Sequence, residues 1–156
     1  MFLAGIIPSD THDTPQYALG TVATNITSGV MKVYKYLKYT TAVGVVAAVS
    51  GNVAYYHAPG GVSTGQSTTC TSDVSESANL GAGVLQSAPT NNQYCWVQIK
   101  GPATLTTALT SGGDGQALTP VGTTDGTLKL SALQSDAVCA FAVKASSKIV
   151  LCEFPF

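Results

Sequence analysis

The sequence predicts an all-β fold: a single-domain β-sandwich or barrel of the jelly-roll or β-tulip type, with an extended N-terminal arm. Short apolar runs rich in β-branched and aromatic residues recur along the chain, and Gly or Pro separates them at short, fairly even intervals. No run of ten or more residues has the helical period of 3.6 residues. The length of 156 residues is that of one domain.

The first 18 residues differ from the rest and predict an arm that precedes a β domain at residues 19–156. Apolar residues are followed by a polar segment, and Pro8 and Pro15 stiffen the chain. The C-terminus is also apolar. We expect the two ends to contact a partner or a sister subunit through Phe2, Leu3, Ile6, Ile7, Pro8, Phe154 and Phe156.

Residues 30–39 alternate between two classes of side chain, which predicts a strand. One face is mainly aliphatic, and the other carries Lys32, Tyr34, Tyr36 and Lys38. This second face has two interpretations. Either Lys32, Tyr34 and Lys38 contact an acidic partner surface, or the face is solvated.

The segments that follow continue the β pattern. Residues 43–49 and 53–57 flank Ser50-Gly51-Asn52 and predict a hairpin. Residues 60–81 are rich in Ser and Thr and predict a loop-rich insertion, in which Asp73 caps at most one helical turn. Further strands are expected at residues 82–87, 93–100, 103–109, 126–130, 137–143 and 148–154.

The charge content limits the possible partners. Charged residues make up 10% of the chain, against about 25% in an ordinary soluble domain. The seven basic residues are all lysines, and they are dispersed, so the chain lacks the basic patch that nucleic acid binding requires. Near-neutral chains with few charges tend to associate. We therefore expect other molecules to cover much of this surface.

Targeting signals and metal motifs are missing from the sequence. No apolar run is long enough for a signal peptide or a membrane span, so we expect synthesis in the cytoplasm and no membrane partner. The four cysteines form no C-x-x-C or other zinc-type spacing. Three of them lie in apolar runs, which favours buried thiols over disulfides.

Enzymatic motifs are weak, and we expect no catalytic activity, cofactor or metal. The G-x-S-x-G pattern around Ser63 lacks the strand and helix of a nucleophile elbow. His12 with Asp10 and Asp13 would make a poor metal site because all three lie on one short segment. Trp96 and the tyrosines favour cross-strand packing, with a sugar-binding platform as the alternative.

Residues 93–105 resemble the central signature of tailed-bacteriophage head decoration proteins, also called capsid cement proteins. An aromatic residue, a small residue and Trp96 are followed by an alternating strand, Val97-Gln98-Ile99-Lys100, that ends at Gly101. Other segments of the chain resemble parts of the same family, and they occur in the same order over residues 18–154. They are residues 19–22, 33–39, 82–85, 124–128, 140–143 and 149–151.

The resemblance implies a function and a location. It implies an all-β virion protein, made in the host cytoplasm, that binds the major capsid protein on the outer capsid surface and cements neighbouring capsomers against internal DNA pressure. It implies self-association, with a homotrimer favoured over a dimer, and it adds Trp96 to the expected partner contacts. The N-terminal arm either adds as a strand to a capsid edge or crosses to a sister subunit. The alternative function is a carbohydrate-binding or adhesin-type β-sandwich on a virion or cell surface.

Overall fold

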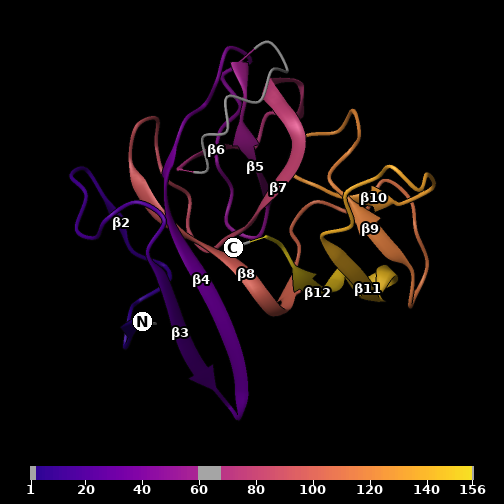
Figure 1. Ribbon diagram of the computed structural model, residues 1–156, viewed down its shortest axis with the longest axis horizontal. Coiled ribbons are helices and arrows are strands. Elements are labelled where there is room, and N and C mark those ends of the chain that lie inside the picture. The colour runs from indigo at the N-terminus through magenta and orange to yellow at the C-terminus, as the bar shows by residue number, and fades with distance from the viewer. Residues whose placement is uncertain (1–2, 60–67, 156) are drawn as a thin grey trace.

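The computed structural model describes residues 3–59 and 68–155 and confirms the predicted all-β, barrel-like single domain. Twelve strands are hydrogen-bonded into one continuous sheet (Figure 1). The strands are β1 (Leu3–Ala4), β2 (Thr11–His12), β3 (Val22–Thr27), β4 (Val30–Tyr39), β5 (Val53–His57), β6 (Thr69–Thr71), β7 (Ser77–Leu85), β8 (Tyr94–Thr104), β9 (Ala117–Thr119), β10 (Lys129–Leu130), β11 (Ala140–Lys144) and β12 (Ile149–Glu153), with short 3-10 turns η2 (Val74–Glu76) and η3 (Ala145–Ser147).

Five of these strands close into a barrel. The order is β4-β6-β5-β7-β8, and β8 pairs again with β4 to complete the ring. Side chains from the inner faces, among them Leu37, Val84, Val97 and Ile99, are almost completely buried in one core. Burying each such side chain contributes about 1.5–3 kcal/mol, so the closed ring is the stable centre of the fold.

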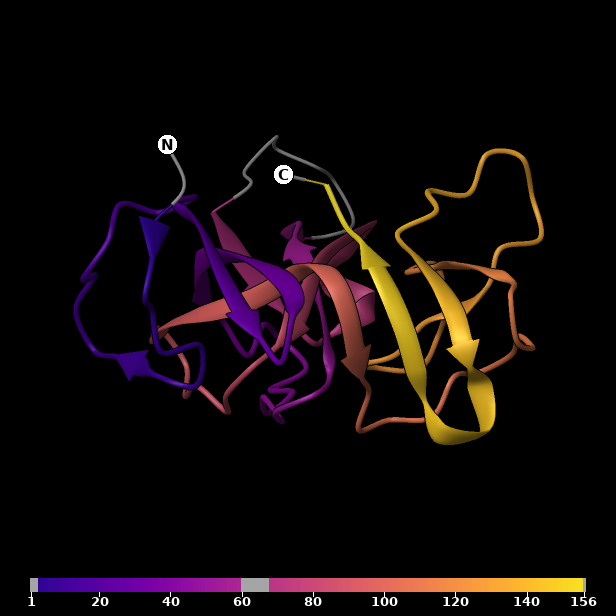
Figure 2. The ribbon, with the colours of Figure 1, turned by 90° about the horizontal axis from the view of Figure 1, so that it is seen from below.

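The long strand β8 leaves the barrel and joins a second group of strands, β12-β11-β9-β10 (Figure 2). Gly101 lies where β8 turns away from β4. It has a φ of 93°, and a Cβ there would lie 2.7 Å from the Met31 carbonyl oxygen, so the position requires glycine. The buried Gln98 amide donates to the carbonyls of Lys100, Gly101 and Pro102 at 2.9–3.2 Å, which fixes the backbone of the bend.

The predicted strand at residues 30–39 is confirmed as β4, and it forms a hairpin with β3. Ser28 and Gly29 connect the two strands, and both have positive φ, as a two-residue type I′ turn requires. The hairpin extends beyond the barrel at the lower edge of Figure 1. The tip of the hairpin is therefore exposed to solvent, whereas most of the rest of β4 is buried.

The predicted hairpin at residues 43–57 is wrong in its first half. Only β5 forms; residues 43–49 are irregular, although their Val content is typical of a strand. Ala42 and Val45 have positive φ, which breaks an extended conformation. The Gly44 N–H donates to Asp73 Oδ2, and the Tyr39 hydroxyl donates to the Val46 carbonyl, so contacts to the barrel replace strand pairing.

The predicted loop-rich insertion at residues 60–81 is part of the barrel in its described portion. Residues 68–81 include β6, η2 and the first half of β7. The single helical turn expected after Asp73 is confirmed as η2, with Asp73 Oδ1 accepting from the Ser75 N–H. Strand β6 has three residues, and the small side chain of Cys70 lies between two threonines, so the sequence pattern does not reveal it.

Candidate interaction surface

Much of the predicted arm lies against the outer side of β4 and β8. Strand β1 pairs in parallel with β3, and β2 pairs with β8 opposite Tyr94 and Cys95. Ile6 is buried, and the Tyr17 ring lies 5.2 Å from the rings of both Tyr36 and Trp96. We call this packed group the aromatic cluster; it consists of Ile6, Tyr17, Ala23, Tyr34, Tyr36, Tyr94 and Trp96.

The aromatic cluster changes the interpretation of several predicted contact residues. Trp96 is 1% exposed, Tyr34 is 4% exposed, and Phe154 is buried in the core. Ile6 is covered as well. The prediction that these four side chains contact a partner is therefore corrected, because the chain itself encloses them.

Cross-strand packing also accounts for the aromatic content of β4 and β8. The rings of Tyr36 and Trp96 lie 4.9 Å apart, and the Tyr36 ring stacks on Tyr94 at 6.2 Å. Such pairs contribute about 0.5–1.5 kcal/mol beyond the area they bury. Because Trp96 is covered, it cannot offer its ring to a sugar, and the sugar-binding alternative gains no support from it.

His12 belongs to the same region rather than to a metal site. Its Nδ1 lies 2.9 Å from the Tyr36 hydroxyl, and the Gln16 N–H donates to the same hydroxyl. Asp13 accepts from the Gln93 amide at 2.7 Å. Among residues 3–59 and 68–155, no group of three or more His, Cys, Asp or Glu side chains is placed to hold a metal ion.

The remaining predicted contact residues are divided between exposed and partly buried positions. Leu3 is 37% exposed and Ile7 is 60% exposed. Pro8, Lys32 and Lys38 are half-buried. The three predictions that fall on Phe2, Phe156 and the Ser63 motif lie outside the described residues.

A buried lysine in the barrel was missed by the sequence analysis. Lys35 is 4% exposed, and its Nζ donates to the Tyr56 hydroxyl at 2.9 Å while lying 5.2 Å from that ring's centre. Burial lowers the pKa of Lys35. Strict alternation along β4 would have placed Lys35 between Val33 and Leu37 on the inward face, so the signal was present.

The clearest uncovered surface is a band that runs across β3, β4, β8, β12 and β11. We call it the apolar strip. Ile26 and Met31 are 69% and 59% exposed at one end, and Leu151 and Phe141 are 38% and 41% exposed at the other. The pairings Ile26↔Met31 and Phe141↔Leu151 place each couple side by side on neighbouring strands.

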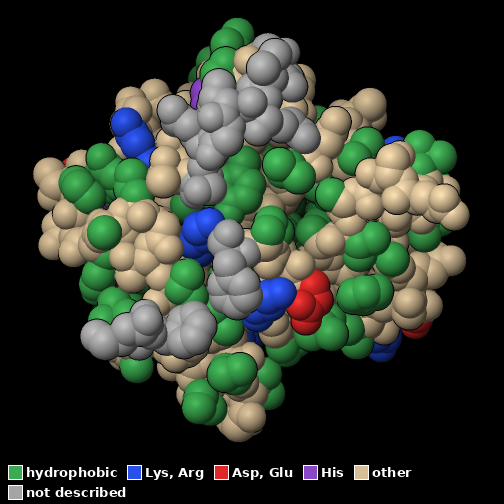
Figure 3. Space-filling view, in the orientation of Figure 1, with side chains coloured by type: hydrophobic (Ala, Val, Ile, Leu, Met, Phe, Trp, Pro, Cys, Tyr) green, Lys and Arg blue, Asp and Glu red, His purple; other side chains and the backbone are tan. Residues whose placement is uncertain are grey.

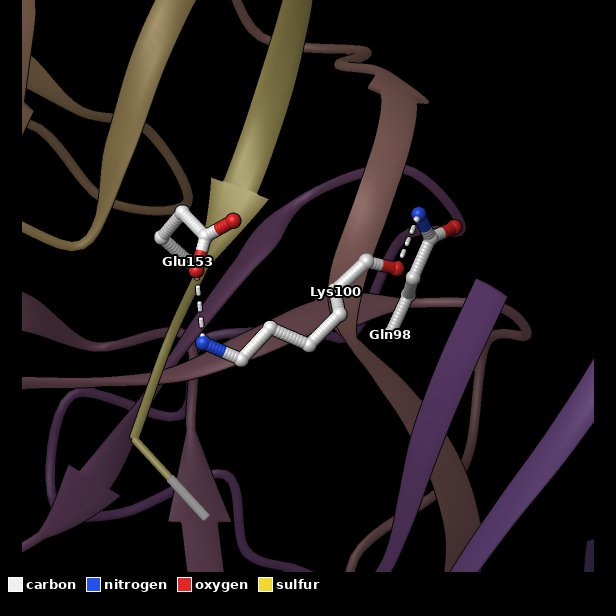
Figure 4. Close-up of polar contacts among 3 residues, drawn as sticks. All are labelled: Gln98, Lys100 and Glu153. Atoms are coloured by element: carbon white, nitrogen blue, oxygen red, sulfur yellow. Dashed lines mark hydrogen bonds and ion pairs between the residues drawn. The ribbon is translucent and has the colours of Figure 1, made fainter. Parts of the chain in front are cut away.

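The middle of the apolar strip carries an ion pair over a groove. Lys100 Nζ on β8 lies 2.7 Å from Glu153 Oε2 on β12 (Figure 4). The groove has a volume of about 480 Å³ and is lined by Thr24, Met31, Val33, Lys100, Gly101, Leu151 and Glu153. In Figure 3, basic and acidic side chains meet near the centre of a face with few other charges.

A second uncovered apolar area is the valine segment, residues 43–49. Val43 is 81% exposed, Val45 is 73% exposed and Val49 is 43% exposed. The segment is nevertheless held in place, by Asp73 and Tyr39 as described above and by the Thr106 hydroxyl, which donates to the Ser50 carbonyl at 2.6 Å. Val45 has a φ of 54°, an unfavourable conformation for a β-branched residue.

The four cysteines are buried and free, as the sequence predicted. Burial is the main cause that raises the pKa of Cys152, to about 12. Burial also raises the pKa of Cys139. Both thiols therefore stay protonated and unreactive at neutral pH.

Comparison with known proteins gives no relative for the chain. No protein-family model matches it, and neither a curated protein nor a solved structure does. Within the described residues, no helix is long and apolar enough to cross a membrane.

Proposed function

We propose that this protein is a structural virion protein that binds the outer surface of a tailed-phage capsid and cements neighbouring capsomers. The observation that carries the proposal is the valine segment. Val43 and Val45 are held in water by contacts from Asp73 and Tyr39, and Val45 is held in a strained conformation. Strain and exposed apolar surface that a fold maintains in this way favour a binding role.

The resemblance of residues 93–105 to head decoration proteins supplies the class of partner. The closed barrel supplies a rigid support, so binding would cost little conformational entropy. A cement also needs more than one interface, and the chain has two separate apolar areas, the valine segment and the apolar strip. A protein that joins several subunits engages the later sites at high effective concentration, so moderate affinity at each site suffices.

The low charge of the chain agrees with permanent coverage. Only 10% of residues are charged, and the net charge is −1. Such a surface has little electrostatic repulsion to keep copies apart when many of them crowd on one particle. The proposal assigns no catalytic residue and no cofactor.

The test is reconstitution on heads that lack the protein. Purified protein is added, and bound copies are measured by co-sedimentation and negative-stain microscopy before and after heat or chelator stress. We expect decorated heads to survive stress that opens bare heads. Equal survival of decorated and bare heads would overturn the cementing role.

The matched variants address the valine segment directly. The double variant Val43→Asp, Val45→Asn removes the apolar contact and places Asn, which tolerates positive φ, at residue 45. We expect its affinity for heads to fall by at least about tenfold. Leu133→Asp, at a side chain that is 66% exposed outside both apolar areas, should bind like the natural protein.

A further inference from the structure

The apolar strip has apolar side chains at both ends and one basic and one acidic side chain between them. Across the sheet order β3-β4-β8-β12-β11, Ile26 and Met31 lie at one end, and Leu151 and Phe141 lie at the other. The Lys100–Glu153 ion pair lies between them. A rotation of 180° about an axis that lies in the plane of the surface, perpendicular to the strip and between the two charges, would place apolar side chains over apolar side chains and each charge over its opposite.

We propose that the apolar strip is the contact surface for a second copy of this chain, related by a two-fold axis that passes near Lys100 and Glu153. This deepens the proposed function, because it names the surface by which sister subunits associate. In a two-fold interface, the same patch is used by both subunits and must be complementary to itself. The apolar strip meets that requirement in both charge and hydrophobicity.

Charge complementarity selects this occupant over others. Lys100 and Glu153 lie side by side, and their side chains are 27% and 45% exposed. A partner surface of a single sign would attract one of the two charges and repel the other. A second copy in the antiparallel orientation brings its Glu153 to Lys100 and its Lys100 to Glu153, so all four charges are paired.

The shape of the region also fits a second copy. The β3–β4 hairpin extends beyond the barrel and presents Ile26 and Met31, as Figure 1 shows for the hairpin. The groove of about 480 Å³ is lined by Met31 of this hairpin and by Leu151 of β12. The hairpin side chains of each copy would pack against Leu151 and Phe141 of the other, which covers both apolar ends at once.

The first measurement is the mass of the natural protein in solution. Sedimentation equilibrium over a range of concentrations should give twice the chain mass of 15.9 kDa. A monomer at all concentrations would overturn the proposal. A trimer, which the family resemblance favours, would also overturn it, since a two-fold axis does not generate three subunits.

Charge-reversal variants then test the pairing near the axis. Lys100→Glu gives each copy two acids in the middle of the strip, and Glu153→Lys gives each copy two bases. We expect either variant alone to dimerise at least about tenfold more weakly than the natural protein. An equimolar mixture of the two should dimerise again, because one copy is then acidic and the other basic. Failure of the mixture to recover would contradict the two-fold pairing.

Apolar variants test the ends of the strip and separate self-association from capsid binding. Met31→Asp and Leu151→Asp should each yield monomers that keep their circular dichroism spectrum, while Leu133→Asp stays dimeric. The same proteins are then added to bare heads. If the natural protein is a dimer that does not bind heads, the proposed function fails and the dimer stands. If the natural protein is monomeric and the two strip variants lose head binding, the strip faces the capsid and the dimer proposal fails.

Discussion

The aromatic cluster and the apolar strip are both apolar surfaces outside the main core, yet only one of them is covered. The aromatic cluster lies on the outer side of β4 and β8, and residues 6–17 fold back over it until Trp96 is 1% exposed. The apolar strip also crosses β4 and β8, begins on β3 and remains open, with Ile26 69% exposed. The chain thus covers one of two similar apolar surfaces and leaves the other exposed.

The difference indicates which surface belongs to the monomer. A segment of the chain covers the aromatic cluster. The short strands β1 and β2, which pair with β3 and β8, and the Tyr17 ring hold this segment in place. In the described residues, no segment lies across the apolar strip in that way. Exposed apolar surface lowers the stability of an isolated chain and promotes association. We therefore interpret the cluster as part of the fold and the strip as a surface for another molecule.

The largest expected effect is on the free energy of unfolding, and it distinguishes the aromatic cluster, as part of the fold, from the apolar strip. Trp96→Ala should lower the free energy of unfolding by about 3–5 kcal/mol, because it leaves a cavity under Tyr17 and Tyr36. Phe141→Ala, on the apolar strip, should change it by less than about 1 kcal/mol in the monomer. Urea unfolding at low protein concentration measures both values.

One result for Trp96→Ala and Phe141→Ala would contradict this interpretation. If Phe141→Ala destabilises the monomer as much as Trp96→Ala does, the strip is part of the fold and the distinction between the two surfaces is wrong. The exchange Trp96→Phe is the milder control, since it keeps an aromatic ring in the cluster. It should recover part of the lost stability.

The comparison also shows what the sequence could reveal. The period-two alternation of β4 predicted both its strand and its two faces, because alternation is a local property of the chain. The buried aromatic face was assigned to a partner or solvent because its cover comes from residues 6–17, which are distant along the chain. Local patterns do not encode which distant segment returns to which face. For the same reason, the sequence did not reveal that β6 closes the barrel.

The candidate surfaces were even harder to predict than the fold. The Val content of residues 43–49 predicted a strand, but the positive φ of Ala42 and Val45 and the contacts from Asp73 and Tyr39 hold the segment out of the sheet. The apolar strip joins five strands that span most of the chain, so it exists only after the barrel has formed. Neither surface follows from periodicity alone.

A smaller effect is expected from the residue that covers Trp96. Tyr17→Ala should destabilise the protein by about 2 kcal/mol, since Tyr17 is half-buried and contacts the rings of Tyr36 and Trp96. The emission of Trp96, the single tryptophan, should shift to longer wavelength as water reaches it. Ile7→Ser, on the same segment but 60% exposed, should leave both stability and emission unchanged. An unshifted spectrum for Tyr17→Ala would mean that other residues exclude water from Trp96.

The smallest expected effect is on the pH dependence of stability, and it comes from Lys35, a buried residue of β4 inside the barrel. Burial lowers the pKa of Lys35, so in the alkaline range below its ordinary value of 10.5 the unfolded chain binds a proton that the folded chain has released. The contribution of Lys35 to stability therefore rises with pH through that window. The buried thiols of Cys139 and Cys152, whose pKa values burial raises, contribute the opposite slope above their ordinary value of 9.0. Above pH 10 the tyrosines also oppose the contribution of Lys35, because burial raises the pKa of Tyr56 to about 12 and also that of Tyr34 and Tyr39.

Lys35→Met isolates the contribution of the buried lysine. The variant keeps a long apolar side chain in the barrel but removes the Lys35 ammonium. Below pH 10 its stability should therefore change less favourably with rising pH than that of the natural protein, while the fall caused by the buried thiols and tyrosines remains. Urea midpoints measured across the alkaline range give both slopes. Lys144→Met, at an exposed position on β11, removes the same charge from the surface and should keep the pH dependence of the natural protein. If Lys35→Met has the same pH dependence as the natural protein, Lys35 does not contribute to it, and the barrel interior tolerates the charged ammonium through its contact with Tyr56.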